Sequence, residues 1–333
     1  MNILRVALAG LVVVRDALLT MMALPFLLPL WCLPWTAAAT VGRWYGYIVW
    51  AVWPRGRRVG MINLRRAKGV SLSRREARES VRVVLGSLGQ SIAEGIQFGR
   101  RFKHASDGGH ALYEPENIEL ERRILADPRP RILVVGHLGS WDLAVGLAAL
   151  RNGRPGAVVV RRVDNPFLNA LWRWVRVRTA TEWIEKHGAA QTALARLRAG
   201  HDVAMLLDEN GGHGGIFVPF FGTVASTRKT PAVLSLAAGA PVVVGACIRR
   251  PGRPFLYRHA LLEPDTALGP DEAIRDLTAR IVATFEGWIR DEPLQWRWIH
   301  PRWKTRPDGH EERYGRADLR RAFARQAGER LAS

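Results

Sequence analysis

Residues 132–150 read ILVVGHLGSWDLAVGLAAL. The apolar run 132–135 predicts a buried strand and the apolar stretch 143–150 predicts a helix, with a glycine-containing turn between them. Ligands of open α/β sheets bind outside the carboxyl ends of the strands, which is where such a turn lies. His137 lies in this turn, so the stretch predicts both a fold and a candidate functional residue.

The same alternation continues along the chain. Further strands are expected at residues 157–160, 202–207, 216–221 and 242–248, and further helices at 165–177, 189–199, 230–238 and 272–290. Short continuous apolar runs separated by helices are typical of a mostly parallel sheet covered by helices on both faces. We therefore predict an α/β fold, with a loop at Asp107–Gly109 ahead of the first of these strands.

The composition restricts the class of protein. With 48% hydrophobic and 24% charged residues among 333, the chain is neither disordered nor wholly embedded in a membrane. The formal charge of +19 favours anionic partners, namely nucleic acid, an acidic membrane surface or a phosphorylated substrate. The two cysteines, Cys32 and Cys247, cannot form a four-cysteine zinc site, and a disulfide between them is not expected.

The amino-terminal segment predicts attachment to a membrane. Residues 17–39 carry no charge and are long enough to cross a bilayer. A second apolar run at 44–53 ends in the basic sequence PRGRR, which favours a cytoplasmic side. Because Pro25, Pro29 and Pro34 remove backbone donors, a broken, re-entrant or interfacial helix is the alternative to a straight span. A buried core helix is the third interpretation.

This pattern divides the chain into three parts. We expect a membrane anchor at residues 1–58, a catalytic domain at 59–310 and a basic tail at 311–333. A basic helix is expected within 63–103, with Ser73 as its cap. Its arginines are expected either to face solvent or to lie against anionic lipid; they are Arg74, Arg75, Arg78 and Arg82.

His137 and Asp142 form the candidate catalytic pair. A histidine beside a carboxylate acts as a general base, because the carboxylate fixes the tautomer and stabilises the imidazolium that forms. Residues five apart in one helix point about 140° away from each other, so the turn at Gly139 must bring the two side chains together. The alternative is a structural turn histidine followed by a first-turn carboxylate that interacts with the helix dipole.

Four segments, in order, resemble one enzyme family. His137 to Asp142 is similar to the His-x4-Asp/Glu motif of the glycerolipid acyltransferase superfamily, and Arg161–Pro166 to its Arg-x-x-Asp-Asn-Pro segment. Asp208, with the glycine-rich loop and Phe217–Gly222 after it, resembles a third block. Trp298–Pro307, WIHPRWKTRP, resembles the closing segment of late lipid A (lauroyl and myristoyl) and phosphatidylinositol mannoside acyltransferases. These resemblances cover nearly the whole chain.

The resemblance implies a function in lipid A (lipopolysaccharide) or glycolipid biosynthesis. Such an enzyme moves a fatty acyl chain from acyl carrier protein or coenzyme A to a hydroxyl of a lipid A precursor, glycolipid or lysophospholipid. It needs no cofactor and works at the cytoplasmic face of the inner membrane, with an anionic lipid membrane as a further partner. His137 would be the base and Asp142 its partner. The residues implied in substrate binding are Arg161, Asp208, Arg302, Lys304 and Arg306.

Arg161 also suits phosphate binding or stabilisation of negative charge from its chemistry alone. Two departures from the family pattern, at Pro301 and at Glu209–Asn210, leave the donor and the acceptor open. Acyl-chain length and oligomeric state are open as well, because no motif specifies them.

Three other functions fit parts of the pattern. A metal-dependent hydrolase would use His137, Asp142, His201, Asp208 and His213 as ligands, but no tight pair such as His-x-His supports it. A serine hydrolase would use Ser140, which lacks a nucleophile-elbow sequence and suits a helix cap. A nucleic-acid-binding protein would use the Arg/Trp mixture near Trp172–Trp174, but no basic recognition motif accompanies it. The sequence favours the acyltransferase, with no metal and no nucleic-acid partner.

Overall fold

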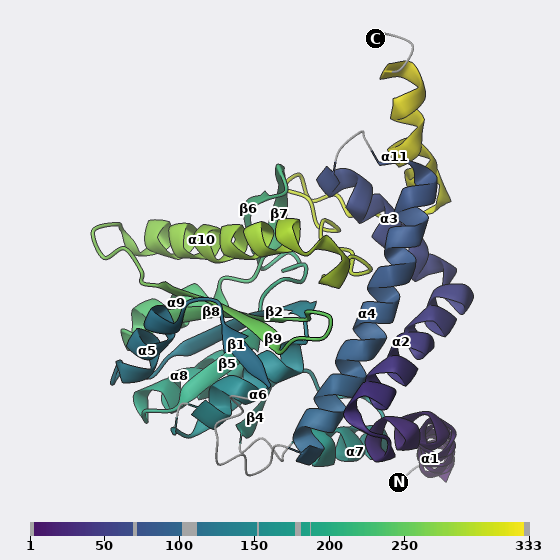
Figure 1. Cartoon of the computed structure of the whole chain (residues 1–333), viewed down its shortest axis with the longest axis horizontal. Helices are drawn as coiled ribbons and strands as arrows, with labels where there is room; N and C mark the ends of the chain where they lie inside the picture. Colours follow the sequence, from purple (N-terminus) through teal and green to yellow (C-terminus); the bar gives the residue numbers. More distant parts are fainter. Residues whose placement is uncertain are drawn as a thin grey trace.

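The computed structural model describes residues 3–68, 72–101, 112–151, 153–176, 181–186 and 188–329. A sheet with helices on its faces forms the body, and a group of long helices stands along one side of it (Figure 1). The loop predicted at Asp107–Gly109 and the end of the basic helix at 102–103 lie outside the described residues.

The body is built on a seven-stranded sheet of order β1-β9-β8-β2-β5-β3-β4. Every neighbouring pair is parallel except the antiparallel pair β8–β9. The predicted mostly parallel α/β sheet is therefore confirmed. The strands are β1 (Tyr113–Pro115), β2 (Ile132–Gly139), β3 (Gly156–Val160), β4 (Thr181–Glu185), β5 (Asp202–Leu206), β8 (Val242–Ile248) and β9 (Phe255–Leu262).

Helices cover both faces of this sheet. Successive residues of β2 point to opposite faces, so Ile132 and Val134 join one hydrophobic cluster while Leu133 and Val135 join another. Burial on both sides explains why β2 is a continuous apolar run rather than an alternating one. The first cluster includes α8 (Ala189–Arg198), α9 (Thr230–Ala238) and α10 (Pro270–Asp291), and the second α5 (Ile118–Ala126) and α6 (Trp141–Arg151).

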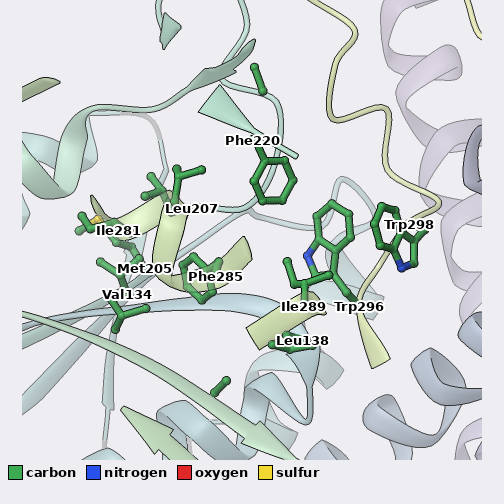
Figure 2. Close-up of a cluster of buried hydrophobic side chains, with 14 of the residues drawn as sticks. Val134, Leu138, Met205, Leu207, Phe220, Ile281, Phe285, Ile289, Trp296 and Trp298 are labelled. Atoms are coloured by element: carbon green, nitrogen blue, oxygen red, sulfur yellow. The ribbon is translucent and has the colours of Figure 1, made fainter. Parts of the chain in front are cut away.

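An aromatic cluster connects α10 to the segment that follows it. Ile281, Phe285 and Ile289 of α10 point toward β2 and β5, and Trp296 lies between Phe220 and Trp298 (Figure 2). The ring centroids of Trp296 and Trp298 are 4.6 Å apart in an edge-to-face arrangement, which favours both rings. Phe220 ends β6 (Ile216–Phe220), which pairs with β7 (Thr223–Thr227) in a separate antiparallel hairpin.

Four long helices form the amino-terminal part: α1 (Ile3–Cys32), α2 (Trp35–Val52), α3 (Pro54–Lys68) and α4 (Arg74–Arg101). The predicted apolar run at 17–39 is divided between α1 and α2, with Pro34 at the start of α2. Among the described residues, α1 is the one helix long and apolar enough over Leu11–Cys32 to cross a bilayer, and little of it is buried. It is a candidate anchor.

The helix α2 packs closely on α4. A Cβ atom added to Gly42 would lie 2.5 Å from the carbonyl oxygen of Gly89, and one added to Gly89 would lie 2.1 Å from that of Gly42. Only glycine at both positions allows this approach of the two backbones. The division into parts at 1–58, 59–310 and 311–333 stays a prediction. Its first boundary falls inside α3, and its third part contains α11 (Arg316–Glu329).

The predicted cap of α4 is confirmed. The Glu76 amide donates to the Ser73 hydroxyl at 3.2 Å, and the Ser73 amide donates to the Glu76 carboxylate at 2.7 Å. This reciprocal capping box satisfies two backbone donors that the helix leaves free. Two arginines of the same helix lie over aromatic rings of α2, Arg78 over Trp50 and Arg82 over Tyr47. A lipid contact of this face stays a prediction.

Candidate active site

His137 lies near the carboxyl end of β2, as the sequence predicts. The pairing of β2 with β8 shifts between Val135 and Gly139, which bends the strand end away from the regular ladder. Gly139 has a φ of +62°, and a Cβ there would lie 2.1 Å from the carbonyl oxygen of Cys247. Glycine is therefore required at this position, and the bend leaves the His137 ring partly exposed.

Asp208 contacts the Nδ1 side of the His137 ring. Nδ1 of His137 donates to one carboxylate oxygen at 2.9 Å, and the backbone amide of His137 donates to the other at 2.6 Å. The indole of Trp296 donates to that second oxygen at 2.7 Å. Because Asp208 follows β5, which neighbours β2, the two side chains meet at the same edge of the sheet.

The Asp208 carboxylate stays ionised in a buried position. Burial alone would raise its pKa, but the interaction with His137 and the hydrogen bonds from His137 and Trp296 outweigh burial and hold the pKa well below its usual range. An ionised carboxylate at Nδ1 fixes the ring tautomer and leaves Nε2 as the nitrogen that can accept a proton. The pair thus has the geometry of a general base with its orienting group.

This arrangement differs from the one predicted for the two carboxylates. Asp208 is hydrogen-bonded to His137, and its side chain is buried. Asp142 begins α6, close to Gly95 of α4, and lines the same cavity as His137. The sequence could not indicate Asp208 as the orienting residue, because that depends on β5 lying beside β2. A role for Asp142 in orienting His137 stays a prediction.

Arg297 contacts the other side of the His137 ring. Its Nη1 lies 3.2 Å from Nε2 of His137 and donates to the Glu209 carboxylate at 2.9 Å. The Arg297 backbone amide donates to the His137 carbonyl at 3.1 Å, next to an isolated bridge between Leu138 and Trp296. Neither Arg297 nor its contact with Glu209 was predicted. The sequence feature that could have indicated Arg297 is its position within the tryptophan-rich stretch 296–298.

A cavity of about 800 Å³ opens beside His137. This volume falls in the range of small-molecule sites, roughly 300–1,000 Å³. Apolar side chains from both sides of the sheet edge form much of its wall, among them Phe98, Trp141, Val145, Val158, Trp183 and Met205. The polar groups on the wall include His137, Asp142, Arg161, Lys186, Glu209, Arg228 and Arg297. The site therefore combines an apolar space with a charged region near the base.

Three of these cations have no counter-ion among the described residues. No hydrogen bond or ion pair joins Arg161, Lys186 or Arg228 to an acidic group in the part of the chain that the structure describes. Burial lowers the pKa of Lys186, and the nearby Arg228 and Arg161 lower it further while Glu209 opposes them. Cations gathered without counter-ions favour an anionic ligand, so the predicted role of Arg161 is supported by its neighbours.

The other predicted cations lie elsewhere. Arg302 is buried with its guanidinium on the Ser226 carbonyl and, at 2.6 Å, on the Thr227 hydroxyl, so it holds the β6–β7 hairpin. Lys304 pairs with Glu311 at 2.9 Å, and Arg306 donates to the Val224 carbonyl at 3.2 Å. None of the three lines the cavity. The guanidinium of Arg302 is enclosed by protein, and Lys304 and Arg306 have structural partners. A substrate-binding role for these three residues stays a prediction.

The alternative functions gain nothing from the geometry. Ser140 is fully buried at the start of α6, out of reach of a substrate. Across the described ranges, no three His, Cys, Asp or Glu side chains converge as a metal site. His213, one of the ligands considered, is exposed and lies 3.4 Å from Glu311.

Residues 12–305 match the model of a protein family described as bacterial lipid A biosynthesis acyltransferase. The chain belongs to this family. It is also similar to the lipid A biosynthesis lauroyltransferase of Escherichia coli strain K12, with 28% identity over 195 residues. That alignment covers 58% of this chain and 62% of the relative, which is less than two thirds of the relative's length. The resemblance stated from the four sequence segments is thereby confirmed.

Proposed function

We propose that the protein is a membrane-associated O-acyltransferase that moves a fatty acyl chain from a thioester donor to a hydroxyl of a lipid A-like acceptor. The observation that carries the proposal is a His137–Asp208 pair facing a largely apolar cavity of about 800 Å³. A buried ionised carboxylate on Nδ1 equips the histidine as a base, and the apolar wall suits an acyl chain. Membership of the acyltransferase family supports the same reaction class.

The reaction needs one base and no covalent enzyme intermediate. The acceptor hydroxyl gives its proton to Nε2 of His137 while its oxygen attacks the thioester carbonyl carbon. Asp208 holds the Nδ1 proton and stabilises the imidazolium, and Trp296 keeps the carboxylate in place. When the tetrahedral species collapses, the carbon–sulfur bond breaks and the leaving thiolate takes the proton from His137.

The charged part of the cavity suits a phosphorylated substrate. Arg161, Lys186 and Arg228 line one cavity and have no counter-ion within the described ranges, and a phosphoryl group satisfies several such donors at once. Both substrates can supply this chemistry: the donor through the phosphodiester of a carrier-protein prosthetic group or the phosphates of coenzyme A, and the acceptor through a phosphorylated headgroup. Acyl carrier protein, coenzyme A and the acceptor lipid are thus the proposed partners.

The amino-terminal helices support a reaction at a membrane. Exposed apolar side chains lie along α1 and α2. Basic residues come next in the chain, in α3. This order fits attachment to the inner membrane with the body on the cytoplasmic side. A chain beginning at residue 34 is expected to leave the membrane fraction, and an unchanged distribution would contradict attachment through α1.

The test of the reaction is acyl transfer by the purified, detergent-solubilised full chain. Thioesters of acyl carrier protein and of coenzyme A are each offered with a lipid A precursor, a glycolipid or a lysophospholipid, and products are identified by mass spectrometry. We expect one added acyl mass on one acceptor, lost in His137→Ala and kept in His213→Ala, whose histidine lies outside the cavity. If wild type and His137→Ala give the same products with every pair, the proposed function is wrong.

A further inference from the structure

The base nitrogen of His137 is occupied by a cation. Nη1 of Arg297 lies 3.2 Å from Nε2, and a guanidinium can only donate, so Nε2 accepts this hydrogen bond. Nδ1 donates to Asp208 at the same time. These two contacts hold the ring in the tautomer that catalysis needs, but they engage the lone pair of Nε2. An acceptor hydroxyl can reach Nε2 only if Arg297 gives up this contact.

Arg297 has a second contact that keeps it near the base when the first is broken. The same Nη1 donates to Glu209 at 2.9 Å, and the backbone of Arg297 is fixed to the His137 carbonyl at 3.1 Å. The closing segment lies beside Glu209, with Nδ1 of His300 3.7 Å from its carboxylate. A short rotation of the guanidinium therefore leaves its charge beside Nε2 and inside the cavity.

The position beside Nε2 is where negative charge develops during acyl transfer. The attacking oxygen must lie within hydrogen-bond distance of Nε2, and the thioester carbonyl carbon lies one forming bond beyond it. Its carbonyl oxygen takes up the electron pair as the new carbon–oxygen bond forms. A fixed cation at this place stabilises that charge more than it stabilises the neutral thioester, which is the condition for catalysis.

We infer that Arg297 is a catalytic residue that stabilises the oxyanion of the tetrahedral intermediate, with Glu209 as its positioning residue. In the free enzyme Arg297 caps the base. When the hydroxyl replaces it at Nε2, the guanidinium turns to the thioester carbonyl oxygen, and it is released when the carbon–sulfur bond breaks. The proposal rests on the proposed acyl transfer.

Both members of the pair are sequence neighbours of the residues that hold His137. Glu209 is one of the positions that departs from the loop expected for the resembled family, and Arg297 lies next to the tryptophan that holds Asp208. A second carboxylate next to Asp208 would repel it. The Arg297 guanidinium compensates that charge at 2.9 Å, through the same Nη1 that contacts Nε2 of His137.

The test is steady-state kinetics of the full chain with Arg297→Ala, Arg297→Lys and Glu209→Gln. We expect Arg297→Ala to lower kcat by roughly 10²–10³-fold with little change in KM, because the lost interaction exists only in the transition state. Arg297→Lys should lose less, since it keeps the charge but not the fork of donors. Glu209→Gln should lower kcat by a smaller factor and add little to Arg297→Ala in the double variant.

Chemical rescue distinguishes catalysis from structure. Millimolar guanidinium chloride should restore part of the kcat of Arg297→Ala, whereas sodium chloride at equal ionic strength should not. Arg196→Ala is the matched control, because Arg196 also forms a double contact with a carboxylate, Glu182, at 2.6 and 2.8 Å, and lies outside the cavity wall. This control should keep wild-type kinetics.

Two outcomes would overturn the assignment while transfer by wild type still depends on His137. If Arg297→Ala is as active as wild type or more active, the arginine only caps the base. If the loss lies entirely in KM and guanidinium does not restore kcat, Arg297 binds substrate instead. If wild type itself shows no His137-dependent transfer, the proposed function has failed and the role of Arg297 fails with it.

Discussion

Two groups of cations, one on the cavity wall and one in the closing segment 302–306, have opposite surroundings. Arg161, Lys186 and Arg228 line the cavity without counter-ions among the described residues. In the closing segment, Arg302 is enclosed by the β6–β7 hairpin and Lys304 is paired with Glu311. The resemblance implied substrate binding for members of both groups, but only the first group faces the space where a substrate would lie.

The difference shows what decides the role of a basic residue. A cation that contacts protein acceptors has already exchanged water for those acceptors, so it has few free donors for a ligand. A cation held beside others without a counter-ion gains from an anion of any source. Sequence shows the charge of a residue but not its acceptors, because the acceptors of Arg302 come from residues 226–227.

The largest effect is expected at Asp208, which contacts both regions. Asp208 accepts from His137 of the cavity and from Trp296, which leads into the closing segment. Asp208→Asn keeps the size of the side chain but removes the charge that stabilises the imidazolium and fixes its tautomer. We expect kcat to fall by roughly 10²–10⁴-fold, measured as single-turnover acyl transfer. Asp142→Asn is the comparison variant, and if it loses more activity than Asp208→Asn, Asp142 is the orienting carboxylate as the sequence predicts.

The next effect concerns stability rather than activity. Replacing Arg302 by methionine removes the donor of the buried Thr227 hydroxyl, while the Ser226 carbonyl keeps the Gly211 amide at 2.8 Å. Loss of a buried hydrogen bond from a charged donor costs about 1–3 kcal/mol, so we expect the free energy of unfolding to fall by about that amount. Denaturant unfolding in detergent measures it, with the more exposed Arg306→Met as control. If the Arg302→Met protein has normal stability but a raised KM, Arg302 binds the substrate.

His300 makes the junction of the two regions sensitive to pH. Burial is the largest cause that lowers the pKa of His300 to about 4; Arg297 and His137 also lower it, while Glu209 and Asp208 oppose them. Between pH 6.5, its ordinary pKa, and pH 4 the unfolded chain binds a proton that the folded chain does not, so stability falls as the pH falls through this window.

The variant His300→Gln isolates this contribution, because glutamine can still accept the Asn210 amide that now donates to Nε2 at 3.0 Å. On going from pH 7 to pH 5, wild type should lose about 2 kcal/mol more unfolding free energy than His300→Gln. Thermal or denaturant unfolding at the two pH values measures the difference. Equal pH dependence in both proteins would show that His300 does not titrate in this window.

The smallest effect compares one lysine from each region. Lys186→Ala removes an uncompensated cation from the cavity wall, and we expect KM for the phosphorylated substrate to rise by roughly tenfold, with less effect at high salt. Lys304→Ala removes an exposed, paired lysine, and we expect KM within about twofold of wild type. Initial rates at two ionic strengths measure both. If the two substitutions raise KM equally, the two groups of cations do not differ in substrate binding.

Much of the fold could be predicted because its central strands are buried on both faces. The runs that became β2, β3, β5 and β8 are continuous and apolar, and the glycines and helices between them were recognisable. The strands β1, β4 and β9 were not predicted. They lie toward the edges of the sheet, and β9 (FLYRHALL) mixes apolar with polar residues because it is less completely buried than the centre. The apolar signal is weakest where burial is incomplete.

The candidate site could be predicted only where it is local. His137 follows from one strand–turn–helix segment. Asp208 and Arg297 contact it from positions 71 and 160 residues away. Asp208 was assigned to the substrate because strand order cannot be inferred from periodicity, and Arg297 was not noticed because an irregular segment carries no period at all.

The contacts between α2, α3 and the body bear on how this enzyme can be recombined with other proteins. The glycine contact between α2 and α4 leaves no room for another side chain at Gly42 or Gly89. The Asn63 amide of α3 donates to the carbonyls of Trp298 and His300, both at 2.7 Å, beside the segment that carries Arg297. The helix α1 is fixed to the same body, because Arg100 and Gln97 of α4 donate to the Trp31 carbonyl at 2.7 and 3.3 Å, and the Asn165 amide donates to the Asp16 carbonyl at 2.8 Å. A chimaera with a foreign anchor must therefore keep the chain from Asp16 onward, so that the exchangeable part of the molecule ends within α1 and well before the sheet.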